Sequence, residues 1–456
     1  MNTQNNNLIP NALTLNNLPY NLSDGLALRR ATLADAEALT NFNAGIHRDR
    51  GAEEPNERVG AWTRDLASGN HPTFRPEDFT LVEDTRTDQV VSSLNLISQT
   101  WTYEGIPFKV GRPELVGTHP DYRNRGLVRA QFEVIHQLST ERGEMVQAIT
   151  GIPYYYRLFG YEMAVTLGGG RVGYKPHVPK LKEDESEPYH VRPATEADLP
   201  FMADLYNNAA ERQPLHCGRD EARWRYELNG RHESSINGRL LRVIESADGE
   251  PVGFLTHPNW QWGTEIWLSC YELKPGASWL AVTPSVIRYL WAAAEEYAAR
   301  DGKECTGFGF GLGEKHPVYN AFADRLPTIH EPYTWYIRVP DLVGFLRHIT
   351  PALERRLAAS DALGYSGELK ISFYRSGLRL VFEQGRLVEV ADWCPTPSEW
   401  GIAAFPNLTF LQLVFCHRTV EELHHLFRDC WTDNSEVRAV LNALFPKRPA
   451  DIWPLD

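Results

Sequence analysis

Three arginines and a glycine stand close together near the end of the first third of the chain. They are Arg123, Arg125, Gly126 and Arg129, placed after a strand-like run that ends at Thr118 and before apolar residues at helical spacing. A helix that begins at Gly126 would point free backbone amides and its positive dipole end at an anion, and the arginines would add charge-assisted bonds. The pattern predicts a pyrophosphate site. An arginine-rich surface turn is the alternative.

A tyrosine-rich segment follows the next predicted strand, which runs from Met145 to Ile149. It reads Gly151-Ile152-Pro153-Tyr154-Tyr155-Tyr156-Arg157-Leu158-Phe159-Gly160-Tyr161. A phenol, with an ordinary pKa of about 10, can donate a proton to a leaving group. Each of the three consecutive tyrosines is a candidate for this role, and each could instead pack its helix against a sheet.

Taken together, the two segments resemble motifs A and B of the GNAT family of N-acetyltransferases. In that family an Arg/Gln-x-x-Gly-x-Gly/Ala loop binds the pyrophosphate of acetyl-CoA, and Val128 here replaces the second small residue. Arg-x-Arg-Gly-Leu-Val-Arg-Ala and Tyr-Arg-Leu-Phe-Gly-Tyr are similar to a narrower branch, which contains the enhanced intracellular survival (Eis) acetyltransferases. Members of that branch have an active acetyltransferase module, a degenerate second copy and a C-terminal sterol-carrier-like (SCP2-like) domain.

The resemblance implies acetyl-CoA as the cofactor and assigns residues to it. The pantetheine arm would pair with the strand edge at 116–118, and the pyrophosphate would lie at 123–129. The implied cofactor-binding residues are Val116, Gly117, Thr118, Arg123, Asn124, Arg125, Gly126, Leu127, Val128, Arg129, Gly151 and Ile152.

The resemblance also implies two catalytic groups. Tyr156 aligns with the branch's proton donor, and the chain's terminal carboxylate, at Asp456, would serve as the base. An exposed terminal carboxylate has a pKa of about 3.3–3.7, so it would need burial or a relay water to accept a proton from an ammonium group. A backbone amide near 116–118 would hold the developing oxyanion.

An internal repeat supports the expected organisation. Arg29-x-Ala31-Thr32-x-Ala34-Asp35 recurs as Arg192-x-Ala194-Thr195-x-Ala197-Asp198, and each copy predicts a helix start with a capping box. A proline-rich, charged stretch at 174–188 lies between the copies. After about residue 340, alternating apolar residues separated by glycines predict an antiparallel meander, and helical patterns follow it.

We therefore expect a mixed α/β (α+β) fold with two tandem GNAT-like modules and a C-terminal SCP2-like domain. The expected parts are a flexible tail at 1–25, a catalytic module at 26–185, a degenerate second module at 186–340 and the sterol-carrier-like domain at 341–456. In the second module we expect a helix that is capped by Thr283, has Pro284 in its first turn and ends at Gly302.

Composition narrows the classes of partner. The 456 residues carry a formal charge of -13, which disfavours nucleic acid and favours a cationic partner. No stretch reaches the roughly 18 apolar residues that a membrane-spanning helix needs, so we expect no membrane partner. The six cysteines form no Cys-x-x-Cys pair, which is typical of reduced thiols and indicates a cytoplasmic protein.

The function that we expect is acetyl-CoA-dependent transfer of an acetyl group directly to a primary amine. The acceptor would be a small cationic molecule of the aminoglycoside, polyamine or lysine type, and direct transfer would need no metal. The alternative is a binding or regulatory protein that senses acyl-CoA or lipid without turnover. The resemblance also implies a homo-oligomer, commonly a hexamer.

Overall fold

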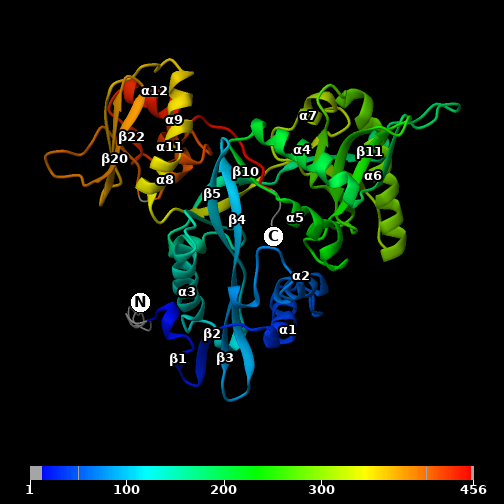
Figure 1. The fold of residues 1–456 in the computed structure, drawn as a ribbon, viewed down its shortest axis with the longest axis horizontal. Coiled ribbons are helices and arrows are strands. Elements are labelled where there is room, and N and C mark those ends of the chain that lie inside the picture. The colour runs from blue at the N-terminus through cyan, green and yellow to red at the C-terminus, as the bar shows by residue number, and fades with distance from the viewer. Residues whose placement is uncertain (1–12, 50, 407, 453–456) are drawn as a thin grey trace.

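The computed structural model describes residues 13–49, 51–406 and 408–452, and its mixture of helices and sheets confirms the expected fold class. Figure 1 shows three lobes. The blue-to-cyan lobe holds the start of the chain, the green lobe its middle and the yellow-to-red lobe its end. The long strands β4 and β5 reach from the first lobe to the junction with the other two.

The first lobe is built on a nine-stranded sheet within the described residues. Its order is β1-β2-β3-β4-β5-β6-β17-β7, and β10 pairs with β4. The strands are β1 (Tyr20–Ser23), β2 (Leu26–Arg30), β3 (Phe79–Asp84), β4 (Gln89–Tyr103), β5 (Ile106–Thr118), β6 (Val146–Ile149), β7 (Glu162–Leu167), β10 (Leu215–Cys217) and β17 (Tyr333–Arg338).

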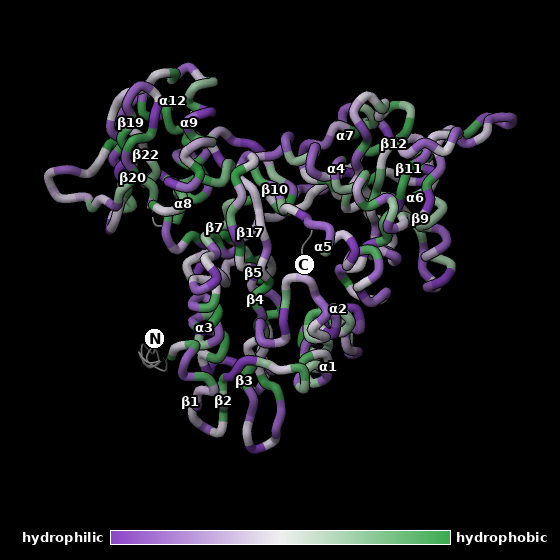
Figure 2. The backbone as a smooth tube through the Cα atoms, in the orientation of Figure 1, coloured by the Kyte–Doolittle hydropathy of each residue, from purple (hydrophilic) through white to green (hydrophobic). Residues whose placement is uncertain are grey.

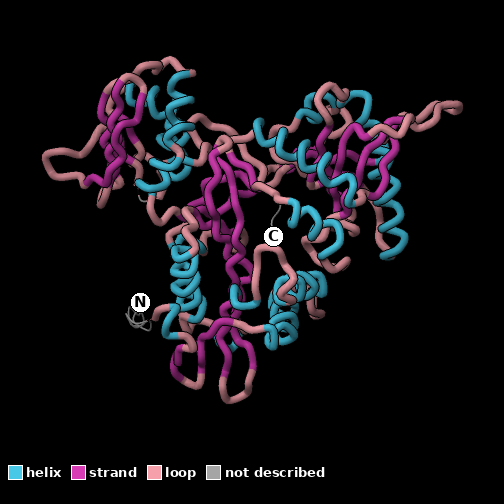
Figure 3. The backbone as a smooth tube through the Cα atoms, viewed as in Figure 1, coloured by secondary structure: helices cyan, strands magenta, loops and turns pink. Residues whose placement is uncertain are grey.

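Helices cover both faces of this sheet, as Figure 3 shows. Helix α3 (Leu127–Glu141) packs on one face, where Phe132 and Ile135 contact a cluster that includes Leu94 of β4. Helices α1 (Ala36–Ile46) and α2 (Glu57–Ala67) cover the other face, where Leu39 and Ile97 share a cluster. Neighbouring strand residues thus point alternately to the two helical layers.

The second lobe contains two four-stranded sheets, ordered β14-β12-β11-β9 and β13-β15-β8-β16. Their strands are β8 (Gly170–Tyr174), β9 (Tyr189–Pro193), β11 (Leu240–Ser246), β12 (Pro251–His257), β13 (Glu265–Leu268), β14 (Cys270–Leu273), β15 (Gly307–Phe310) and β16 (Thr328–His330). Its helices are α4 (Leu199–Ala209), α5 (Glu221–Arg225), α6 (Trp279–Asp301) and α7 (Pro317–Ala321).

The helix expected to begin at Thr283 begins earlier. The Ser278 side chain caps α6 by accepting a hydrogen bond from the amide of Ala281, and Thr283 is buried inside the helix. Pro284 therefore lies at the sixth helical position, and the helix continues through it to its C-cap at Gly302.

The third lobe combines a five-stranded sheet, β20-β19-β18-β21-β22, with five described helices. The strands are β18 (Gly367–Ser372), β19 (Gly377–Glu383), β20 (Arg386–Trp393), β21 (Ala403–Ala404) and β22 (Trp431–Thr432). The helices are α8 (Leu342–His348), α9 (Thr350–Ala358), α10 (Leu411–Val414), α11 (Val420–Leu426) and α12 (Ser435–Leu444). The antiparallel meander expected after residue 340 is confirmed as β18–β20.

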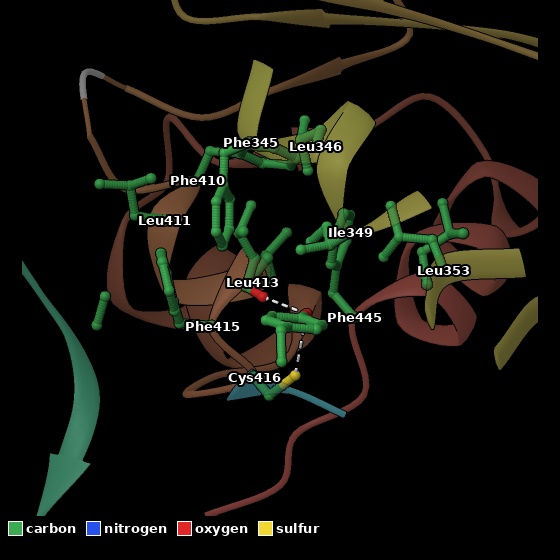
Figure 4. Packing of buried hydrophobic residues seen from close by; sticks show 14 of the residues in the cluster. Phe345, Leu346, Ile349, Leu353, Phe410, Leu411, Leu413, Phe415, Cys416 and Phe445 are labelled. Carbon is green, nitrogen blue, oxygen red and sulfur yellow. Dashed lines mark hydrogen bonds between the residues drawn. The ribbon is translucent and has the colours of Figure 1, made fainter. Parts of the chain in front are cut away.

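The tip of the β4–β5 hairpin is built into the core of the third lobe. Figure 4 shows this core, in which Phe345 and Phe415 stack. The Tyr103 hydroxyl of β4 donates a hydrogen bond to the carbonyl of Val414 at 2.6 Å and accepts one from Arg356 at 2.8 Å. Figure 2 shows green, hydrophobic residues gathered inside the lobes. The first and third lobes therefore share buried surface.

Three strands lie in a different lobe from the one that the expected boundaries give them. β10 lies within 186–340 but pairs with β4 in the first lobe. β8 precedes residue 185 but pairs with β15 and β16 in the second lobe, while β17 precedes residue 340 but pairs with β6 and β7 in the first. The two lobes exchange strands, so single cuts at 185 and 340 do not separate the sheets.

The expected tail at 1–25 differs from the structure from Leu13 onward. Leu13 is buried, its carbonyl accepts a hydrogen bond from Gln137 of α3, and Tyr20–Ser23 forms the edge strand β1. In the part of the chain that the structure describes, no helix is long and apolar enough to cross a membrane.

Candidate functional site

A cleft of about 740 Å³ opens where β5 and β6 diverge. The two strands pair in parallel only at Val110–Val146 and Gly111–Gln147. β5 then continues to Thr118 and stays paired with β4 on its other side alone. The unpaired edge of β5 can donate and accept backbone hydrogen bonds to an extended ligand.

The backbone of β5 changes direction inside this cleft. The ladder with β4 shifts register between Ser93 and Asn95, and Leu115 takes a φ of 53°. Helix α1 closes the cleft from the other side, since a Cβ on Gly117 would lie 2.7 Å from Cγ2 of Ile46. Glycine at 117 therefore allows the end of α1 to approach β5.

The predicted phosphate loop has the geometry of a helix start. Gly126 is the N-cap of α3 with a φ of 74°, and a Cβ there would meet nothing within 4 Å. Asn124 also takes a positive φ, 62°. The first amides of a helix lack intrahelical acceptors, so those at the start of α3 can bind an anion.

Aromatic rings and backbone carbonyls hold the arginines around this helix start. Arg125 lies over the ring of Tyr122 at 5.0 Å, and Arg129 lies over the ring of Phe159 at 5.6 Å. The Tyr122 hydroxyl donates a hydrogen bond to Asp84 at 2.9 Å, which fixes the loop to β3. The guanidinium groups thus add positive charge beside the free amides.

A buried glutamine fixes α3 to the sheet beside the loop. Gln131 accepts a hydrogen bond from Ser92 at 2.7 Å and donates one to the carbonyl of Thr80 at 2.9 Å. The Ser92 hydroxyl also lies 2.9 Å from that of Thr118. These hydrogen bonds therefore fix the position of the start of α3 relative to the end of β5.

Tyr156 lies at the inner wall of the cleft and is only 3% exposed. It starts the short 3-10 turn Tyr156–Phe159, and its ring packs against Phe132 of α3 and Tyr336 of β17. Burial, with a further contribution from the charge of Glu114, raises the pKa of the Tyr156 phenol well above its usual value. The hydroxyl therefore stays protonated at neutral pH and can donate a hydrogen bond.

Glu114 and His47 line the side of the cleft nearest α1. Burial raises the pKa of Glu114 to about 7, although its ion pair with Arg112 acts in the opposite direction. Burial lowers the pKa of His47, so this imidazole is neutral near pH 7. Both groups thus differ from exposed side chains of their type.

The structure brings the predicted cofactor residues and Tyr156 together in this one cleft. Those that line it are Val116, Gly117, Thr118, Arg123, Asn124, Arg125, Gly126, Leu127, Val128, Arg129, Gly151, Ile152 and Tyr156. Asp456 lies outside the described residues. Among the residues that are described, no group of three or more His, Cys, Asp or Glu side chains could hold a metal ion.

Sequence reasoning assigned no role to Glu114 or to the end of α1, Ile46 and His47. Glu114 carried a usable signal, because an acidic residue inside an apolar strand needs a partner or a function. The contribution of α1 depends on a long-range contact between α1 and β5, for which the local sequence gives no signal.

Comparison with known proteins agrees with this geometry. Residues 30–164 match the family model of the acetyltransferase (GNAT) domain. No curated protein matches the sequence. Residues 30–164 are thus a GNAT acetyltransferase domain, and the chain is an N-acetyltransferase with acetyl-CoA as its acyl donor.

Solved structures share the fold over almost the whole chain. A probable N-acyltransferase from Enterococcus faecalis has a TM-score of 0.61 at 13% identity, covering 93% of this chain and 97% of that one. A GCN5-related N-acetyltransferase from Kribbella flavida has a TM-score of 0.61 at 16% identity, covering 94% and 97%. Eis1 from Mycobacterium abscessus has a TM-score of 0.57 at 13% identity, covering 93% and 99%.

Proposed function

We propose that this N-acetyltransferase transfers the acetyl group of acetyl-CoA directly to a primary amine of a small cationic molecule. One observation supports this proposal. The unpaired edge of β5, the start of α3 at Gly126 and Tyr156 all line the same cleft. The β5 edge would bind the pantetheine arm of the cofactor, the start of α3 would bind its pyrophosphate, and Tyr156 would lie at its sulfur.

In the proposed reaction the amine nitrogen attacks the thioester carbonyl, and a carbon–nitrogen bond forms. The carbonyl oxygen becomes an oxyanion, which a backbone amide of 116–118 would stabilise. The carbon–sulfur bond then breaks, and the coenzyme A thiolate receives a proton from the Tyr156 hydroxyl. Because the phenol's pKa is raised, Tyr156 acts first as a hydrogen-bond donor to the sulfur and transfers its proton as the nitrogen replaces it.

The acidic composition supports a cationic acceptor. The chain carries a formal charge of -13, and Glu53, Glu54 and Glu57 follow α1, whose end at Ile46 and His47 lines the cleft. An aminoglycoside, a polyamine or a lysine side chain would fit this charge.

The wider organisation of the Eis-like branch is part of the proposal. We take the second lobe as a degenerate GNAT-like module, the third as an SCP2-like domain, and the assembly as a cytoplasmic homo-oligomer, as in the hexamers of that branch. Both repeat copies form the same capping box, in which Asp35 pairs with Arg29 and Asp198 pairs with Arg192. The terminal carboxylate of Asp456 stays a predicted base.

The experiment is acetyl transfer by the full chain. Release of coenzyme A thiol is followed after acetyl-CoA is mixed with aminoglycosides, polyamines and lysine peptides, and the product is identified by mass. The expected result is an acceptor that gains one acetyl group for each thiol released. Tight binding of coenzyme A without transfer to any of these amines would contradict the proposal and favour a non-catalytic acyl-CoA-binding or lipid-binding protein.

A further inference from the structure

A second cavity, of about 930 Å³, opens in the third lobe. It lies where the link from β17 to α8, the turn between β18 and β19 and the start of α10 come together. Among the described residues, none that lines this cavity also lines the cofactor cleft. The proposed acetyl transfer gives the cavity no role, so it is a candidate for a separate binding site.

The floor of this cavity is apolar. Phe410 and Leu411, which Figure 4 shows in the core of the third lobe, are buried, as is Leu378 of β19. The ring of Phe373 lies 5.5 Å from that of Phe410 and adds to the same lining. Such a surface binds an alkyl or aryl group by removing it from water.

The side chain of Tyr374 forms part of the cavity wall and is 38% exposed. Its amide donates a hydrogen bond to the Ser372 hydroxyl at 3.1 Å, and its own hydroxyl donates one to the carbonyl of Asp429 at 2.6 Å. These bonds fix the ring at the mouth of the cavity. A partly exposed aromatic ring attracts an organic cation to its face.

The charged groups that line the cavity are mostly acidic. They are Asp341, Asp392, Asp429 and Arg375, and all four are exposed. None of them forms an ion pair with another residue in the described part of the chain. The lining therefore has an excess of negative charge, which favours a cationic ligand.

Two of these carboxylates are placed directly beside the apolar floor. Asp392 lies opposite Leu378 in the β19–β20 ladder, and cross-strand partners share a face of the sheet. Asp341 caps α8, since its carboxylate accepts a hydrogen bond from the amide of Gly344 at 2.8 Å. Negative charge thus stands at the rim of an apolar cavity.

We propose that this third-lobe cavity binds a small organic cation with an apolar group, of the arylalkyl ammonium type. The apolar group lies on the floor at Phe410 and Leu411, and the cationic group lies at the rim between the aspartates and the Tyr374 ring. A neutral molecule lacks the Coulomb attraction, and a fatty acid brings a further negative charge to an acidic rim. The site does not depend on the proposed acetyl transfer.

The test is a ligand-observed NMR titration of the full chain with three probes that share a phenyl ring. They are benzyltrimethylammonium, 2-phenylethanol and 3-phenylpropanoate, which are cationic, neutral and anionic. The cation has no nitrogen that could accept an acetyl group. It should bind with a Kd of about 1 mM or lower, at least about 3-fold below that of the alcohol, and should bind more weakly in about 0.5 M salt. Decanoate tests a fatty acid in the same way.

Two variants locate the binding. Asp392→Asn combined with Asp429→Asn should raise the Kd of the cation about 3–10-fold and leave that of the alcohol unchanged. Tyr374→Gly should weaken the binding of both, because it removes the wall, while glycine takes the φ of 70° found there without strain. Asp361→Asn is the matched control, since Asp361 is an exposed aspartate of the same lobe that does not line the cavity. Thermal unfolding shows whether each variant is folded.

Three outcomes would each overturn the inference. They are equal affinity for the cation and the alcohol, tighter binding of 3-phenylpropanoate or decanoate than of the cation, and a folded double variant that binds the cation as the wild type does. The last result would place the cation elsewhere in the protein. None of the three bears on acetyl transfer, and a chain that transfers no acetyl group would leave this site as it is.

Discussion

Tyr156 and Glu114 differ in what their surroundings do to them. Burial raises the pKa of both groups. The pKa of the Tyr156 phenol lies far above neutral pH, whereas the pKa of the Glu114 carboxyl is about 7. Tyr156 is thereby kept as a donor and Glu114 becomes able to exchange a proton. Burial and neighbouring charge, and not residue type alone, therefore set the protonation of these two acids in one cleft.

Tyr156→Phe should lower kcat by about 10²-fold or more and leave the affinity for coenzyme A within a few-fold, because the hydroxyl acts on the departing sulfur. The control is Tyr154→Phe, since Tyr154 is 74% exposed and does not line the cleft. Steady-state kinetics and calorimetry of both variants check this. A Tyr156→Phe enzyme with wild-type turnover would remove this hydroxyl from the mechanism.

The helix start at Gly126 could be predicted because its signal is local. Arg123, Gly126 and the helix that follows lie in one short segment, and helix-start chemistry depends on neighbours in sequence. Glu114 lies close to this segment in sequence, but its buried setting depends on Arg112 and on α1, which only the folded sheet brings together.

At the scale of elements, β5 and α1 together shape the cleft. The unpaired edge of β5 gives a ligand backbone to pair with, and the end of α1 sets how wide the cleft is. Their contact depends on Gly117, where any side chain would meet Ile46.

Gly117→Ala should lower the free energy of unfolding by ~1–3 kcal/mol and weaken coenzyme A binding, because the new Cβ would lie 2.7 Å from Ile46 and α1 must shift. Gly45→Ala is the matched control in the same helix. A Cβ at Gly45 meets nothing within 4 Å, so alanine should leave stability equal or raise it by ~0.5–1 kcal/mol. Thermal unfolding and calorimetry measure both effects, and equal behaviour of the two variants would show that this contact does not set the cleft.

Capping boxes and the meander were predictable, whereas helix starts with competing caps were not. Thr283 followed by Pro284 is a typical helix start, yet α6 begins one turn earlier, at Trp279, because Ser278 supplies a cap there and the half-buried Trp279 packs against the second lobe's core. The exchange of β8 and β17 between lobes has no local signal either, since pairing partners far apart in sequence decide it.

At the scale of the whole molecule, the last described segment connects the third lobe to the second. Arg448 donates its amide to the carbonyl of Cys416, and Asp451 donates its amide to Gln213 at 2.8 Å. Burial, followed by the charge of Glu272, raises the pKa of Asp451 to about 7. The folded state therefore holds this carboxyl protonated where an unfolded one is ionised.

The protonation of Asp451 makes the docking of residues 446–452 depend on pH. Between about pH 4 and 7 the docked segment binds more protons than the undocked one, so docking weakens as pH rises through that window. Asp451→Asn should remove this loss and slow amide hydrogen exchange of 446–452 at pH 8, by an amount equivalent to ~1–3 kcal/mol, with a smaller difference at pH 5. The exposed Asp361→Asn is the control. Identical pH dependence in wild type and Asp451→Asn would contradict the linkage.

We predict that the free amides at the start of α3 bind the diphosphate of a coenzyme A molecule. The most direct measurement is calorimetric titration of the full chain with coenzyme A, repeated with Gly126→Val, because valine cannot hold the φ of 74° found there. We predict one molecule bound per chain with a micromolar Kd, and a Kd at least about 10-fold higher for the variant, which would still unfold cooperatively. No heat of binding at millimolar coenzyme A, or equal affinity in the folded variant, would contradict the account.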